Sequence, residues 1–181
     1  DHQEYFAAIS DKKVCKYIMK EGKPQEIANI ATAFAKLGIS DHQEFFAAIS
    51  DKEVCRFIVN EGDPQAIANI ASAFATLGIE DNSNFFETLS SDIKCIEGGT
   101  SQAICNTLWS FACLGLMSDS IYHSAIRSLW ELATSMPAGA FTTEGLLQIR
   151  QVYTVSMVEG GTLVLDDIPP ELLSRINNVV F

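Results

Sequence analysis

Histidines that stand beside carboxylates are the first residues in this sequence that could do chemistry. His2 and His42 occur in identical DHQE segments, where an imidazole next to an acid would suit proton transfer. A site duplicated whole in consecutive segments is more typical of a structural role, so we expect these histidines to be solvated or to cap helices. The acidic pair at 166–167 precedes a proline-rich turn, which favours a helix cap over a metal site.

Motifs of known enzyme classes are not found in the sequence. It has no nucleophile elbow, no Walker loop, no dinucleotide-binding glycine triplet and no zinc-protease motif. The Gly-Gly pairs at 98–99 and 160–161 lack the strand and helix that flank a phosphate-binding loop, and they are typical of loops. None of the three histidines has a nearby pair of cysteines that would complete a zinc site. The sequence therefore predicts a protein without catalysis, cofactor, metal or evident small-molecule substrate.

A polar stripe on one predicted helix, residues 24–37, has the residue types of a binding surface. Its side chains recur at helical spacing on the face opposite the apolar one, and Gln and Asn keep their places in three successive segments. These amides offer both donors and acceptors, while the positions that vary are suited to setting specificity. The candidate binding residues are Gln25, Asn29, Thr32, Lys36, Gln65, Asn69, Ser72, Thr76, Gln102, Asn106 and Trp109.

Two interpretations of this stripe stay open. The constant Gln and Asn side chains could form a ladder of hydrogen bonds between neighbouring helices or to loop backbone, which would make them structural. The varying positions fit a ligand-facing groove better. They are Thr32, Lys36, Ser72, Thr76 and Trp109. Trp109 would either stack on a base or anchor a peptide, or else lie buried under the C-terminal part of the chain.

The helices that must position these residues come from a tandem repeat. Residues 1–120 divide into three copies, 1–40, 41–80 and 81–120, and the first two differ at only 11 of 40 positions. A degenerate repeat and a helical cap are predicted over 121–181. Helical units that cannot bury their apolar faces alone must stack on one another. The predicted fold is therefore all-α, an α-solenoid of about 40-residue repeats with a C-terminal capping unit.

Local signals place three helices in each copy. In the first copy we expect them near 2–9, 11–20 and 24–37, with the first two either separate or running together. Proline is tolerated at the first helical position and glycine suits the residue past a helix end, so Pro24 and Gly38 bound the last of them. The apolar stripe of this helix consists of Ile27, Ile30, Phe34 and Leu37.

Further signals concern the second copy and the C-terminal part. Ser50 and Glu53 have the spacing of a capping box. Beyond the third copy we expect an amphipathic helix over 121–134, a further helix over 143–158, and a last short helix that starts at Pro169–Pro170. An atypical terminal unit of this kind seals the open core of a stacked array.

Charge and cysteine placement narrow the partners and the compartment. The net charge is -11, and only residues 1–40, with six lysines against five acids, come close to a basic surface, which argues against nucleic acid. No apolar run is long enough to cross a bilayer. Cys15, Cys55 and Cys95 recur every 40 residues, about one repeat thickness apart and too far for a disulfide. We expect free thiols and a reducing, intracellular setting, with delivery to an organelle or a host cell left open.

A family resemblance is carried by the strings IANIATAFAKLG, IANIASAFATLG, ICNTLWSFACLG and LLQIRQVYTVSMVEG. They resemble the helical repeats of octotricopeptide-type proteins and are similar to the heptatricopeptide-like repeats of FAST-kinase and RAP-domain proteins. The resemblance implies an α-solenoid that binds organellar RNA through its repeats, although this chain is acidic. Related repeats also resemble those of proteins from intracellular bacterial pathogens, which would imply a host-directed effector.

The leading hypothesis is a non-enzymatic scaffold that binds a protein partner along its repeat face. The acidic balance, the lack of catalytic motifs and the extended surface of stacked repeats support it. The alternative is an RNA-binding repeat protein, in which the 25/29/32/36 stripe meets bases and the lysines of the first copy meet phosphates. No membrane partner is expected.

Overall fold

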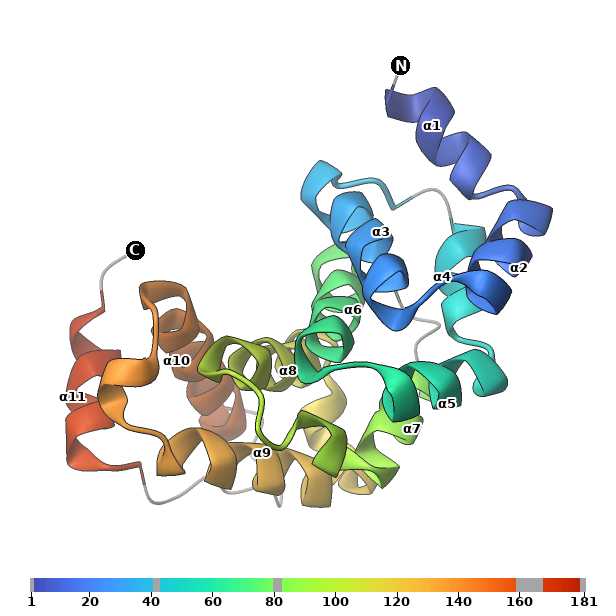
Figure 1. Ribbon diagram of the computed structural model, residues 1–181. Coiled ribbons are helices and arrows are strands. Elements are labelled where there is room, and N and C mark those ends of the chain that lie inside the picture. Colours follow the sequence, from blue (N-terminus) through green and yellow to red (C-terminus); the bar gives the residue numbers. More distant parts are fainter. Residues whose placement is uncertain (1, 41–42, 80–82, 159–167, 180–181) are drawn as a thin grey trace.

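The computed structural model of this chain describes residues 2–40, 43–79, 83–158 and 168–179, and over these residues the fold is helical with no strand (Figure 1). The expected all-α class is confirmed. The helices are α1 (His2–Ile9), α2 (Lys12–Glu21), α3 (Pro24–Leu37), α4 (Gln43–Ile49), α5 (Lys52–Glu61), α6 (Pro64–Leu77), α7 (Ser83–Ser91), α8 (Ser101–Cys113), α9 (His123–Ser135), α10 (Thr143–Val158) and α11 (Pro170–Asn178). Short 3-10 turns are η1 (Ile93–Ile96), η2 (Leu116–Ser118), η3 (Ser120–Tyr122) and η4 (Ala138–Ala140).

The helices predicted for the first copy are confirmed by α1, α2 and α3, and the first two stay separate. The Asp11 carboxylate caps α2 by accepting the backbone N–H groups two and three residues on, at 2.9 and 3.3 Å. Asp51 caps α5 in the same way, so the capping box expected at Ser50 and Glu53 is wrong. A carboxylate at this position also meets the positive end of the helix dipole, an advantage that the serine hydroxyl lacks.

Prolines and glycines bound the third helix of each near-identical copy, as predicted. Pro24 and Pro64 occupy the first turns of α3 and α6. Gly38 and Gly78 follow these helices with φ of 63° and 61°, a left-handed conformation that favours glycine because it has no Cβ. The chain therefore leaves both helices in the same direction, which starts the next copy at an equivalent place.

Two rows of helices run through the molecule (Figure 1). The third helices pack in chain order, α3 on α6 and α6 on α8, and α10 continues the row beyond α8. In the second row α2 packs on α4, α5 on α7, and α7 on α9. At the C-terminal end α11 packs against α10. Each of the first two copies thus meets the next through both rows.

The C-terminal helices expected over 121–134 and 143–158 are confirmed as α9 and α10. α10 lies beside α8 as α8 lies beside α6, and its first turn repeats that of α8. Thr142 and Thr100 each accept the backbone N–H three residues on through Oγ1, at 3.1 and 3.2 Å. The segments TTEGLLQ and TSQAICN carry this match in the sequence. The place of α10 in the row is therefore that of a third helix.

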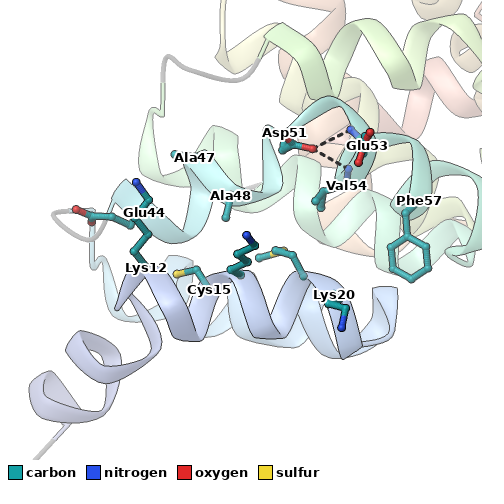
Figure 2. A pocket seen from close by; sticks show the side chains of 12 residues that line it. Lys12, Cys15, Lys20, Glu44, Ala47, Ala48, Asp51, Glu53, Val54 and Phe57 are labelled. Carbon is teal, nitrogen blue, oxygen red and sulfur yellow. Dashed lines mark hydrogen bonds between the residues drawn. The ribbon is translucent and has the colours of Figure 1, made fainter.

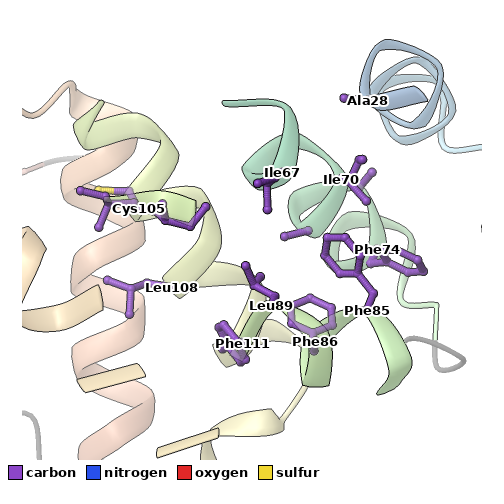
Figure 3. Packing of buried hydrophobic residues seen from close by; sticks show 14 of the residues in the cluster. Ala28, Ile67, Ile70, Phe74, Phe85, Phe86, Leu89, Cys105, Leu108 and Phe111 are labelled. Carbon is purple, nitrogen blue, oxygen red and sulfur yellow. The ribbon is translucent and has the colours of Figure 1, made fainter. Parts of the chain in front are cut away.

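Aromatic rings join one copy to the next through the core. Phe34 of α3 stacks on Phe45 of α4 with ring centres 5.2 Å apart, and Phe74 of α6 stacks on Phe85 of α7 at 5.5 Å. Phe46 stands edge-on to both Phe34 (5.8 Å) and Phe74 (5.2 Å), which makes the chain of rings continuous. It continues through Phe86 to Phe111 of α8 (Figure 3). From Phe111 it reaches Tyr122 of η3. These rings are buried, so each junction between copies is also part of one core.

The buried side of α3 differs from the predicted apolar stripe. Ile27 and Phe34 are fully buried, but Ile30 is only half-buried and Leu37 is 52% exposed. Ala28 is fully buried and faces α6 (Figure 3). This agrees with what the alanines at 28, 31, 33 and 35 predict, because they flank the stripe and are small enough to let neighbouring helices approach closely.

All five cysteines are free thiols, and those of Cys15 and Cys55 are buried at equivalent places. Each of these two Sγ atoms donates to the carbonyl oxygen of the residue six positions earlier, at 3.1 Å. Burial, and then the charge of Asp51, raises the pKa of Cys55 to about 12. Burial raises the pKa of Cys105 to about 12 as well. These two thiols are therefore protonated at neutral pH, and a protonated thiol is a poor nucleophile.

Replacement of Phe45 by alanine should destabilise the fold far more than replacement of Tyr5, which holds the same position in the first copy. Phe45 is fully buried against Phe34, whereas Tyr5 is 62% exposed. Removal of a buried ring costs about 3–5 kcal/mol of unfolding free energy, while loss of an exposed ring should cost under about 1 kcal/mol. Urea unfolding followed by circular dichroism measures both. Equal losses would show that the aromatic chain does not hold the copies together.

Candidate binding surfaces

The Gln and Asn of the predicted stripe form a hydrogen-bonded pair on each third helix. The Gln Nε2 donates to the Asn Oδ1 four residues on, at 3.1 Å on α3 and at 2.8 Å on both α6 and α8. Residues four apart lie one above the other on a helix, which brings the two amides within reach. The structure thus brings together the constant members of the stripe, in the pairs Gln25–Asn29, Gln65–Asn69 and Gln102–Asn106.

Threonine hydroxyl groups at the starts of α8 and α10 bond to the Gln of two of these pairs. Thr100 Oγ1 donates to Gln65 Oε1 at 3.4 Å, and Thr142 Oγ1 donates to Gln102 Oε1 at 3.0 Å. The same two threonines cap α8 and α10, so one side chain serves both the helix start and the contact between neighbouring helices. On α6 and α8 the pairs therefore have the contacts of a structural ladder.

The stripe of α8 is covered by α10. Gln148 Nε2 donates to Asn106 Oδ1 at 2.9 Å, and both side chains are buried. Trp109 is half-buried, and its Nε1 donates to Gln151 Oε1 at 2.6 Å. Of the two places expected for Trp109, the structure has the one under the C-terminal part of the chain. Gln148 and Gln151 are not among the predicted binding residues, although the match between TSQAICN and TTEGLLQ aligns Gln148 with Asn106.

The stripe of α3 is the open one. Three of its side chains are exposed, those of Gln25, Asn29 and Lys36. Asp63, the N-cap of α6, occupies the position that Thr100 holds before α8. A carboxylate has no hydrogen to donate to the Gln25 oxygen. The bond that Thr100 donates to Gln65, and Thr142 to Gln102, therefore has no equivalent donor at Asp63. The remaining members of the stripe are Thr32 and Ser72, which are half-buried, and Thr76, which is exposed.

A groove of about 860 Å³ lies between α2 and the α4–α5 pair (Figure 2). Much of its lining is apolar, with Cys15 and Met19 from α2, Ala48 from α4, and Val54 and Phe57 from α5. The predicted stripe, on α3, α6 and α8, contributes no residue to this lining. Residues that lie about 40 positions apart form the two sides, so no local pattern in the sequence announces the groove.

The two sides of the groove carry opposite charges. α2 contributes Lys12, Lys16 and Lys20, which follow one another at one helical turn. The α4–α5 side contributes Glu44, Asp51 and Glu53. Figure 2 shows Lys12 and Glu44 at one end of the groove and Phe57 at the other. An apolar lining between charged edges is the composition of a protein-binding surface.

A smaller groove of about 350 Å³ repeats this arrangement between α5 and α7. Lys52 and Arg56 line it at the positions that match Lys12 and Lys16 of α2. Its other side is more polar, and Asn84 Nδ2 crosses from α7 to donate to the carbonyl oxygen of Ser50 at 2.9 Å. The first groove is therefore the wider and more apolar of the two.

The described part of the chain has neither a candidate metal site nor a helix that could span a membrane. No group of three or more His, Cys, Asp or Glu residues there could hold a metal ion. None of the helices in those ranges combines the length and the apolar character needed to cross a membrane. His42 and the acidic pair at 166–167 lie outside the described residues, as does the side chain of His2, so the hypotheses about them stay predictions.

Comparisons with protein-family models, with curated proteins and with solved structures found no match to this chain. The resemblance to octotricopeptide-type repeats therefore rests on the helix strings alone. The groove between α2 and the α4–α5 pair and the open stripe of α3 are therefore the features that bear on function.

Replacement of Asn106 by alanine should destabilise the fold, and replacement of Asn29, its equivalent in the first copy, should not. Asn106 Oδ1 accepts from Nε2 of buried Gln148, which would lose this acceptor, and an unsatisfied buried donor costs about 1–3 kcal/mol. Asn29 is exposed, so water replaces the lost bond and the change should stay within about 0.5 kcal/mol. Urea unfolding measures the difference. A loss for Asn29→Ala as large as that for Asn106→Ala would contradict the assignment of α3 as the open stripe.

Proposed function

We propose that this chain is a non-enzymatic α-solenoid of about 40-residue helical repeats that binds a segment of a protein partner. The repeated sequence and the packing of α3, α6, α8 and α10 in chain order support the solenoid. The groove between α2 and the α4–α5 pair carries the binding function, because it is an open, largely apolar surface that the packing of the chain leaves unfilled.

An apolar groove between helices suits a protein segment better than other ligands. Burial of apolar surface drives most protein association, and amphipathic helices commonly lay their apolar side chains into such grooves. Phe57 lines the groove and keeps 36% of its surface exposed, and aromatic side chains are frequent anchors of protein interfaces. The binding surface proposed here is thus the groove, with the open stripe of α3 as a separate surface.

RNA is the second candidate, and the exposed amides and lysine of the α3 stripe favour it. Gln25 and Asn29 could contact bases, and Lys36 with the lysines of α2 could contact phosphates. The net charge of -11 opposes a polyanion, and the apolar lining of the groove offers little to a charged backbone. We therefore prefer the protein partner. Buried thiols such as Cys55 suit a reducing intracellular compartment, which we include in the proposal.

Filling the groove should abolish peptide binding. A displayed library of helical peptides is selected on the chain, and the recovered peptides are titrated by fluorescence anisotropy. The Ala47→Trp variant places a large ring on an exposed lining position, so we expect the recovered peptides to bind it at least about tenfold more weakly. Ala7→Trp is the matched control, because Ala7 is exposed at the same position of the first copy and does not line the groove.

Two results would contradict the proposed function. The first is that the selection yields no binding peptide, or only peptides whose affinity Ala47→Trp leaves unchanged. The second is that a single-stranded 20-nucleotide RNA binds the chain while no peptide does, with an affinity that falls steeply between low and raised salt. Circular dichroism of both tryptophan variants checks that each keeps the helical fold.

A further inference from the structure

The lysines on the α2 side of the groove form a regular row. Lys12, Lys16 and Lys20 are separated by four residues each, a rise of about 6 Å along the helix per step. The α2 segment has four lysines and one glutamate. This side of the groove is therefore locally basic on a protein whose net charge is -11. A helix laid along α2 would meet a cation at every turn.

The carboxylates on the opposite side are partly neutralised by their own helices. Asp51 is the N-cap of α5, where its Oδ1 accepts two backbone N–H groups. Glu53 lies in the first turn of α5 and Glu44 in the first turn of α4. The positive end of a helix dipole compensates a negative charge at each of these places. The acidic side thus attracts a ligand less than its three charges suggest.

Lys12 and Lys16 do not share this compensation. Lys16 lies in the middle of α2, away from the negative helix end, and Lys12 lies in the first turn, where the dipole disfavours a cation. Lys20 forms an ion pair with Glu21 at 3.0 Å, so it is already partly neutralised. Lys12 and Lys16 are therefore the two cations of the lining that their own helix compensates least.

The smaller groove keeps the same basic pair. Lys52 and Arg56 line it at the positions of Lys12 and Lys16. The third lysine of the row, Lys20, corresponds to Asn60. Both grooves thus present two cations one helical turn apart, and the rest of their lining differs. The pair is a feature of the junction between copies and is not confined to the first one.

We infer that the groove between α2 and the α4–α5 pair binds an amphipathic helix of a protein partner that carries two carboxylates one turn apart. Its apolar stripe packs on Met19, Val54 and Phe57, and its two acidic side chains face Lys12 and Lys16. This inference rests on the proposed function and specifies the chemistry of the partner. Carboxylates at i and i+4 of a helix match the spacing of the two lysines, which fixes the register of the partner.

Charge-matched variants of chain and peptide test this inference. Among the recovered peptides whose binding Ala47→Trp abolishes, we expect Glu or Asp at positions four apart beside the apolar stripe. Changing those two acids to Gln should weaken binding about tenfold at low salt, and by less at raised salt because exposed charges are screened. In the chain, Lys16→Glu should weaken binding of the acidic peptide similarly, and a peptide with Lys only at the position that faces residue 16 should recover it.

Lys13→Glu is the control in the chain, because Lys13 lies on the same helix with the same charge, is exposed and does not line the groove. It should leave the affinity of the acidic peptide nearly unchanged. Recovered peptides that need the groove but carry no such acids, or that lose nothing on Glu→Gln exchange, would overturn this inference and leave the proposed function standing. Equal losses for Lys13→Glu and Lys16→Glu would also overturn it, since they would indicate attraction by overall charge. Failure to recover any groove-dependent peptide would overturn both.

Discussion

The contact between the phenylalanine of one third helix and the phenylalanine pair of the next copy is the constraint on which the rest of the structure depends. Phe34 contacts both Phe45 and Phe46, which belong to the next copy. Phe46 also contacts Phe74, so it packs between the third helices of two copies. No copy can bury these rings alone. Their packing fixes the distance between successive third helices, and that distance decides which amides meet and how wide a groove stays open between α2 and α4.

Local sequence signals were sufficient to place the helices, because those signals act within a helix. Pro24 and Gly38 bound α3 where expected, since a missing N–H and a positive φ are properties of single residues. The buried side was harder to predict. Leu37 is exposed and Ala28 is buried, because a neighbouring helix decides which side is covered, and periodicity does not contain that neighbour. The place of α10 was missed for the same reason.

The candidate site was predictable in part. Helical spacing placed Gln and Asn on one face of each helix, and on all three helices the two amides bond to each other, a contact that was not predicted. The spacing could not show that α10 buries Asn106 while Asn29 stays exposed, since the helix that covers Asn106 lies about 40 positions away in the sequence. The groove was even less predictable from local patterns. Lys16 and Phe57 come from different copies, and only the stacking of those copies places them around one hollow.

The differences between the two near-identical copies fall mainly on the second helix. Five of the 11 differing positions lie within the ten residues of α2 and α5, including the change from Met19 to Val59 and from Lys20 to Asn60. The paired phenylalanines and the buried alanines that join the copies hold their places, apart from Tyr5 at the exposed end and Glu26 where α6 has an alanine. Because the second helices line the grooves, such changes alter the lining of each groove and leave the phenylalanine contacts between copies intact. If the grooves bind partners as we propose, a change in one groove would alter what binds there without loss of the ring packing that joins the copies.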